Sequence, residues 1–274
     1  AADYISYAYR IEAQDIANSG WNYVSSSSFV TLSFWIKSSV AQDFKGYIRA
    51  HDGTSQAYAF ATGSLSADTW TKITKTISGN SNLTFDNNND VGFEIVLGGF
   101  WGTDYTDNSV TEDAWAAYAS GTRMKDNTST WYTTNDATLE ITGVQLEVSD
   151  HATSYDHKSY QEILRDCQRY YYIYADGSEG SNHWQLTNIH GYSTGQLETT
   201  IDYSNANLRA IPSLVQGSGT GWYNAVNASA SITFNSFTAI YQPSKRQGLL
   251  YTNSVSGTTP VTGMAYRCQF ANTG

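Results

Sequence analysis

The residues best suited to chemistry in this sequence are aromatic side chains that lie among acidic ones in a long segment without a strand pattern. About 35 residues, from Gly98 to Tyr132, hold this mixture. Aromatic rings stack on the C–H faces of sugars, and carboxylates accept hydrogen bonds from sugar hydroxyls, so the segment is suited to saccharide binding. The candidate glycan-binding residues in it are Trp101, Tyr105, Trp115, Tyr118 and Trp131.

A second interpretation of the same segment is that it folds around a small aromatic core of its own. Connections of this length are usually either functional or locally folded. The run EDAWAAYAS, Glu112 to Ser120, would then be a short helix that buries Trp115 and Tyr118. The sequence leaves both interpretations open.

Three further aromatic residues are candidates for glycan binding. Trp35 alternates in phase with Ser33 and Lys37, which places it on the polar face of its strand, either covered by a loop or offered to a ligand. Trp222 and Tyr223 follow a glycine-rich turn, and surface loops of this kind often carry recognition residues. For these two residues, packing against the edge of a sheet is the alternative.

Catalytic motifs are missing from the sequence. The histidines show no HExxH or zinc-ligand spacing, and there is no G-x-S-x-G, P-loop or G-x-G-x-x-G pattern. Asp104 and Asp107 are spaced so that they could act as a glycosidase pair, but among 25 acidic residues such pairs arise by chance. We therefore predict that the protein is not an enzyme and keep glycan hydrolysis as an alternative.

A calcium site is a further candidate. The run DNNND, from Asp86 to Asp90, places carboxylate and amide oxygens at alternate positions, and these are the hard ligands that Ca²⁺ prefers. The run lacks the glycine and the distal glutamate of an EF-hand loop, and a solvated turn is the competing interpretation. Asp86 and Asp90 are the candidate ligands, and Glu12 and Glu147 are the other places for an ion. No other cofactor is expected.

The elements that must position these residues are mainly strands. In the first 150 residues, apolar and polar residues alternate in several segments, which predicts two sheets packed face to face in a jelly-roll-like sandwich. Strands near Tyr9 and Ile141 are expected to lie close together. Apolar residues alternate from Leu139 to Val148 with a slip of one position at Gly143, which predicts a β-bulge there.

A short amphipathic helix is predicted after this strand. Ser159 with Glu162 three residues later is a capping box, and the helix that follows is about three turns long. Such a helix is too short to be stable alone, so its apolar face packs either against symmetry mates around a three-fold axis or against its own domain. The candidate interface residues are Tyr160, Ile163, Leu164 and Cys167.

Length and composition agree with an all-β protein. The 274 residues are enough for two domains. We predict two β-sandwich (jelly-roll-like) domains joined by a short α-helix: a sandwich over residues 1–150, a hinge and helix over 151–172, and a second sandwich over 173–274. Cys167 and Cys268 are expected to be buried thiols.

The charge of the chain indicates which classes of partner it can bind. The net charge of −10 and the lack of a basic cluster argue against a nucleic-acid partner. The sequence contains no run of about 18 apolar residues, so it does not predict membrane insertion. Because the chain enters a strand pattern almost at its first residue, we expect it to be a fragment or to lack an upstream region.

One stretch resembles a known family. The strand ITGVQLEV, the hinge with Thr153, Tyr155, Asp156 and His157, and the following residues of the helix up to CQRYY resemble a module of bacteriophage tail fibres and related virion appendages. Other segments resemble the carbohydrate-binding-module type of sandwich that precedes this hinge, and the arginine–small–proline motif of the C-terminal domain. They are Val30–Ser39, Asp68–Gly79 and Val91–Gly99 for the sandwich, and Leu208–Leu214 for the motif.

The resemblance implies a non-enzymatic virion protein, a tail fibre or receptor-binding subunit that attaches the particle to host cell-surface glycans. It also implies a homo-oligomer, generally a homotrimer, in contact with other virion proteins, and a structural Ca²⁺ of the kind that sandwich modules often hold. Two alternatives stay open. One is a head fibre or capsid decoration protein with a mainly structural role, and the other is a glycan-degrading enzyme or its binding module.

Overall fold

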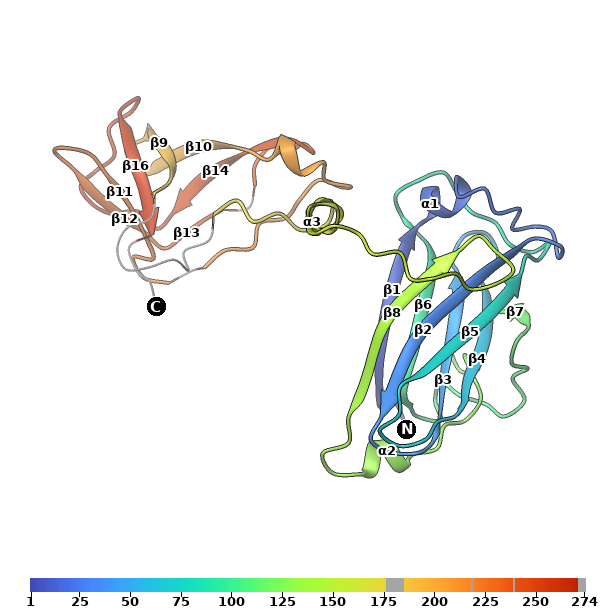
Figure 1. Cartoon of the computed structure of the whole chain (residues 1–274). Helices are drawn as coiled ribbons and strands as arrows, with labels where there is room; N and C mark the ends of the chain where they lie inside the picture. Colours follow the sequence, from blue (N-terminus) through green and yellow to red (C-terminus); the bar gives the residue numbers. More distant parts are fainter. Residues whose placement is uncertain (176–184, 218, 239, 271–274) are drawn as a thin grey trace. The chain divides into compact units, whose positions relative to one another are not determined.

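The computed structural model describes residues 1–175, 185–217, 219–238 and 240–270 (Figure 1). The chain divides into two compact units, Ala1–His157 and Lys158–Gly274, and each is described by itself. Strands dominate both units and all of their pairings are antiparallel. The prediction of an all-β protein is confirmed.

The first unit consists of two sheets packed face to face. The large sheet has five strands in the order β1 (Tyr4–Glu12), β6 (Val91–Trp101), β3 (Asp43–Ala50), β4 (Gln56–Ser64) and β7 (Trp115–Ala117). The small sheet has three strands in the order β5 (Thr71–Ser78), β2 (Phe29–Ser38) and β8 (Leu139–Glu147). Two short helices, α1 (Ala13–Ala17) and α2 (Thr130–Thr133), complete the unit.

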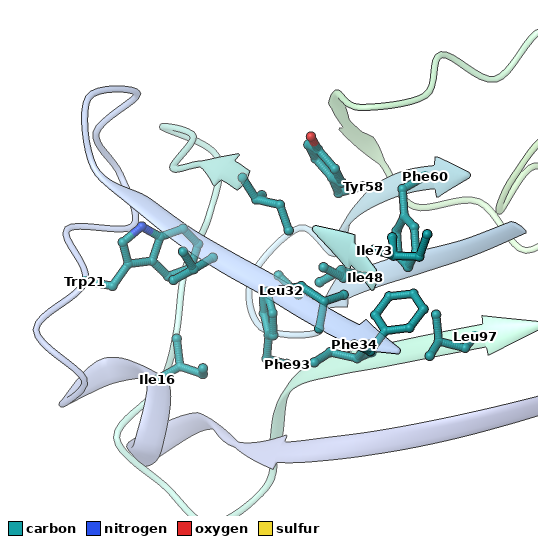
Figure 2. Close-up of a cluster of buried hydrophobic side chains, with 14 of the residues drawn as sticks. Ile16, Trp21, Leu32, Phe34, Ile48, Tyr58, Phe60, Ile73, Phe93 and Leu97 are labelled. Carbon is teal, nitrogen blue, oxygen red and sulfur yellow. The ribbon is translucent and has the colours of Figure 1, made fainter. Parts of the chain in front are cut away.

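The core of this unit lies between the two sheets. Leu32 and Phe34 of the small sheet meet Ile48, Phe60 and Phe93 of the large sheet, and all five side chains are fully buried (Figure 2). These residues occupy alternate positions of their strands, as a half-buried strand requires. For these residues the alternation predicted the buried face correctly, whereas Tyr7 and Tyr9 of β1 share the inward phase but are exposed.

The bulge predicted in β8 is present. Ser33 pairs with Gln145 and Trp35 pairs with Thr142, so β8 has one more residue than β2 over this interval. Gly143 takes a φ of +59°, a left-handed conformation that glycine adopts without strain. The bulge lets apolar residues on both sides of Gly143 face the same core.

The second unit begins with helix α3 (Tyr160–Gln168) and continues into strands that, among its described residues, form one antiparallel sheet. The eight described strands follow the order β13, β14, β10, β9, β16, β11, β12 and β15. Their bounds are Gln185–Ser193 (β9), Gln196–Asp202 (β10), Tyr223–Val226 (β11), Ser231–Phe234 (β12), Ser236–Phe237 (β13), Gln247–Asn253 (β14), Ser256–Gly257 (β15) and Ala265–Phe270 (β16), with a 3₁₀ turn, η1, at Ser204–Ala206.

This sheet folds over on its own core. The ring of Phe237, in β13 at one edge, lies 5.0 Å from the rings of both Tyr223 in β11 and Phe234 in β12, near the other edge. The second unit therefore encloses its core with one curved sheet, where two separate sheets were predicted. Only Asn235 separates β12 from β13, so the chain crosses directly between the two edges.

Helix α3 begins as predicted and leaves its apolar face open. The hydroxyl of Ser159 accepts from the backbone N–H of Glu162, and the Glu162 carboxylate accepts from the backbone N–H of Ser159. Tyr160 is 73% exposed and Ile163 48% exposed. Cys167 shares this face and is exposed, so the prediction that it is buried is wrong, whereas Cys268 is buried as predicted.

Candidate functional site

The outer face of the small sheet carries rows of side chains that point away from the core. Residues directly opposite each other in antiparallel strands share a face. One row consists of Thr76, Thr31 and Glu147, the next of Thr74, Ser33 and Gln145, and the next of Lys72, Trp35 and Thr142. Lys37 and Glu140 form the last row. The face is polar at one end and aromatic at the other.

The polar end of this face is covered by residues 149–157, which we call the clasp. The hydroxyl of Thr31 donates to the carbonyl of Ser149 at 2.9 Å, and that of Thr76 donates to the carbonyl of Asp150 at 3.2 Å. Thr31 and Ser33 are consequently buried although they point outward. The clasp thus belongs to the first unit, which explains why that unit extends to His157.

Two side chains of β8 hold the middle of the clasp. The carboxylate of Glu147 accepts from the backbone N–H of Thr153 at 2.9 Å and from its hydroxyl at 2.8 Å. These hydrogen bonds, the backbone one above all, lower the pKa of Glu147. The amide of Gln145 accepts from the N–H of Asp156 at 2.8 Å and donates to Thr153 at 3.2 Å. Each outward polar group of the two covered rows in β8 is therefore engaged.

The aromatic end of the face remains open to solvent. Trp35, Trp70 and Tyr155 are 42%, 41% and 46% exposed. Gly143 lies between two of them, because a Cβ atom at this residue would be 3.5 Å from the Trp35 ring and 3.8 Å from the Tyr155 ring. The bulge glycine therefore leaves room for the two rings to approach each other.

Polar groups surround these rings. The ammonium of Lys37 lies 5.2 Å from the centre of the Trp70 ring and 2.6 Å from a carboxylate oxygen of Glu140. Thr142 and Lys72 flank Trp35 on the two neighbouring strands and are exposed. Half-exposed rings with hydroxyl, ammonium and carboxylate groups beside them can stack on a sugar ring and hydrogen-bond its hydroxyls. We call Trp35, Trp70, Tyr155, Lys37 and Thr142 the aromatic face.

Most of the aromatic residues predicted between Gly98 and Tyr132 form a local core. Trp101 is 4% exposed, Tyr4 stacks on its ring at 4.8 Å, and the guanidinium of Arg123 lies 5.2 Å from its centre. Tyr105 and Tyr118 pack half-buried against the same cluster. The alternative of a small aromatic core is thus what the structure contains, and Trp101 offers no free face to a sugar.

Trp115 and Trp131 contribute to the main core of the first unit. Trp115 lies in strand β7, where a short helix was the alternative prediction, and its indole N–H donates to the carbonyl of Ser78 at 2.8 Å. Trp131 lies in α2, and its indole N–H donates to the carbonyl of Thr138 at 3.1 Å. Both rings pack partly buried against the core between the sheets.

The two candidates of the second unit are also packed inward. Tyr223 is 2% exposed and donates its hydroxyl hydrogen to the carbonyl of Gly217 at 3.0 Å. Trp222 is half-buried and lines a cavity of about 610 Å³. The cavity wall is mainly apolar and aromatic, with Tyr170, Leu186 and Phe237 among its residues. The predicted alternative of packing against the sheet describes Tyr223 well.

The candidate calcium ligands lie at one end of β1. The carbonyl of Asp90 accepts from the backbone N–H of Ala13 at 2.9 Å, and buried Glu12 accepts from the side chain of Gln14 at 2.6 Å. Within the described ranges, no three His, Cys, Asp or Glu side chains come together as a metal site would require. The calcium site at Asp86 and Asp90 stays a prediction, because amide and backbone oxygens of the intervening asparagines could also serve as ligands.

A charged cluster lies on the outer face of the large sheet. Glu94 is 6% exposed, and its carboxylate accepts from Arg10 Nε at 2.9 Å and contacts His51 Nε2 at 3.3 Å. The hydrogen bond to His51 and then that to Arg10 lower the pKa of Glu94 to about 2, against the opposing effect of burial. This cluster links β1, β6 and the end of β3.

Of the three rings of the aromatic face, sequence reasoning named one as a binding candidate, Trp35, and did not name the other two. Trp35 was predicted from its phase in β2. Trp70 precedes the first residue of β5 but shares the polar phase of Lys72 and Thr74, although it was not singled out as a binding residue. Tyr155 lies in the clasp, outside any alternating pattern. The polar phases of Trp35 and Trp70 were thus the signal in the sequence for this site.

Comparison with protein-family models, with curated proteins and with solved structures found no match. In the part of the chain that the structure describes, no helix has the length and apolar character needed to cross a membrane.

Proposed function

We propose that this chain is a non-enzymatic appendage protein of a bacteriophage virion, a tail fibre or receptor-binding subunit that binds host surface glycans through the aromatic face. The observation that carries the proposal is the exposure of Trp35, Trp70 and Tyr155 on the open half of the small sheet. The resemblance of the hinge and helix to phage fibre modules supports the virion assignment. Trp35 lies within strand β2, and a ring held on a strand suits binding because little conformational freedom is lost on contact.

The test is glycan binding by the whole chain and by single variants. Trp35→Ala and Trp70→Ala should each weaken binding by about tenfold, as expected for the loss of roughly 1.4 kcal/mol of ring stacking. Tyr132→Ala is the matched control, because Tyr132 is 44% exposed and lies outside the aromatic face, stacked on Phe100. Equal binding by the wild type and both Trp variants on an array of host surface glycans would contradict the proposal.

Self-association through α3 is part of the same proposal. Tyr160, Ile163 and Cys167 form an exposed apolar stripe on a helix of nine residues, which is too short to be stable in water without packing. A homotrimer would bury the stripes against each other around its axis. Sedimentation of the chain as a monomer at micromolar concentration would contradict this part.

A head fibre or capsid decoration protein is the second candidate. It is favoured by the same exposed stripe, because an apolar surface on a connecting helix suits assembly with other virion proteins. The glycan experiment separates the two functions, since a decoration protein requires no saccharide binding at the aromatic face.

A further inference from the structure

The large sheet of the first unit has five strands and the small sheet three, and the strands of the large sheet that the small one leaves uncovered lie at the β1 side. The indole of Trp115 at the start of β7 bonds to Ser78 at the end of β5, and Lys75 of β5 pairs with Asp113 at 2.9 Å. Strand β5 therefore lies at the β7 end of the large sheet. Strand β8, at the opposite edge of the small sheet, lies toward the β1 end (Figure 1).

Strand β1 has aromatic side chains on its inward face that no element of the small sheet covers. Tyr7 pairs with Leu97 and Tyr9 pairs with Ile95, and both partners are buried in the core between the sheets. Tyr7 and Tyr9 share that inward phase but are 55% and 65% exposed. Neither phenol has a hydrogen bond or ring contact with another described residue. The small sheet thus ends before it covers β1.

Strand β8 has a free edge at the same side. It pairs with β2, and no other described strand pairs with it. Three of its inward residues, Leu139, Ile141 and Leu146, pack against the core but remain only partly buried. We call the free edge of β8 together with Tyr7 and Tyr9 the seam.

We propose that the seam accepts an extended polypeptide strand from a partner, with apolar side chains at alternate positions. A strand beside β8 would lie about 5 Å from it and about 10 Å above β1, which is the spacing of stacked sheets. Its backbone would satisfy the free N–H and C=O groups of β8. Its inward side chains would cover Tyr7 and Tyr9. The occupant would act as the fourth strand of the small sheet.

The structure favours a separate strand over a second copy of β8. Gly143 is the middle residue of β8, so two copies paired antiparallel about a two-fold axis would bring their bulges together at the centre of the ladder. Bulges disrupt pairing and are a common protection of sheet edges against self-association. A single regular strand can pair with β8 on either side of the bulge.

The test supplies such a strand by fusion to the whole chain. A segment of alternating Val and Thr, equal in length to β8, is joined to Ala1 through a flexible Gly/Ser linker, which gives a millimolar effective concentration. The control carries the same extension with two prolines, which cannot donate ladder hydrogen bonds. Both fusions alter the N-terminal amine equally, so its contacts with Thr103 and Asp104 do not differ between them.

Two measurements decide the outcome. Hydrogen exchange at residues 139–147 should be at least about tenfold slower in the Val/Thr fusion than in the proline control. Tyr7 and Tyr9 should be protected from nitration in the Val/Thr fusion alone. Equal exchange and equal nitration in the two fusions would overturn the proposal. So would dimerisation of the unfused chain that Tyr9→Lys abolishes, because a second copy would then occupy the seam.

Discussion

The buried carboxylate of Glu94 gives the most quantitative prediction, because its environment favours the charged form strongly. Its pKa falls from the ordinary value of 4.5 to about 2 through its hydrogen bonds with His51 and Arg10. One pKa unit corresponds to about 1.4 kcal/mol, so ionised Glu94 contributes at most about 3 kcal/mol to the free energy of unfolding. The perturbation is Glu94→Gln, which keeps the shape of the side chain and removes its charge.

The sign follows from proton linkage. Because the folded-state pKa lies below the unfolded value, the stabilisation is present above about pH 4.5 and is lost as the pH falls toward 2. The difference in unfolding free energy between wild type and Glu94→Gln should therefore be about 3 kcal/mol at pH 7 and shrink toward zero near pH 2.

The assay is urea unfolding of the whole chain at several pH values, followed by tryptophan fluorescence. Six of the eight tryptophans lie in residues 1–157, so the signal reports mainly on the first unit. Glu140→Gln is the matched control: its ion pair with Lys37 is half-exposed, and its loss should cost less than about 1 kcal/mol. A wild-type advantage that stays constant from pH 7 to pH 2.5 would refute the argument.

Three further predictions concern the bulge, the helix cap and the thiols. Gly143→Ala should lower the unfolding free energy by about 1 kcal/mol in urea titrations, because alanine is strained at a φ of +59° while its Cβ meets only ordinary contacts. Ser159→Ala should remove the capping box and speed hydrogen exchange over residues 160–168, at a cost of about 1 kcal/mol to the helix. Cys167 should react with a disulfide reagent in the native protein, whereas Cys268 should react only on unfolding. Burial closes access to Cys268 and raises the pKa of its thiol to about 12.

Features set by neighbours along the chain could be predicted from the sequence. The slip of apolar phase at Gly143 located the bulge, since a strand of period two can keep both halves on one core only by adding a residue. The pairing of Ser159 with Glu162 located the start of α3, because both partners of a capping box lie within one turn. The alternation in β2 placed Trp35 outward.

Features set by contacts distant in the sequence could not be predicted in this way. The sequence around Trp101, close to several aspartates, predicts a loop residue. In the structure the ring is covered by Tyr4, which is far before it in the sequence, and by Arg123, which is after it. The aromatic face needs Tyr155, which comes from the clasp and has no phase signal, and Trp70, whose polar phase did not show that it lies beside Lys37. Composition showed a chain rich in aromatic residues but could not say which rings the fold would bury.

Substitution of Trp35 can show whether its side chain serves the stability of the fold or the binding of a ligand. The neighbouring row of the small sheet carries Thr74, Ser33 and Gln145 at equivalent outward positions, so a small polar side chain is compatible with this face. Because 42% of Trp35 is exposed and the core side chains of its strand, Phe34 and Ile36, lie on the other face, the indole contributes less to folding than a core ring does. Trp35→Thr should accordingly lower the unfolding free energy by no more than about 2 kcal/mol, less than the roughly 3–5 kcal/mol of truncating a core aromatic residue. If the aromatic face binds glycans, the same substitution removes one stacking ring and should weaken binding by about tenfold. A Trp35→Thr variant that remains folded but binds glycans more weakly would therefore separate a binding role of this side chain from a stabilising one.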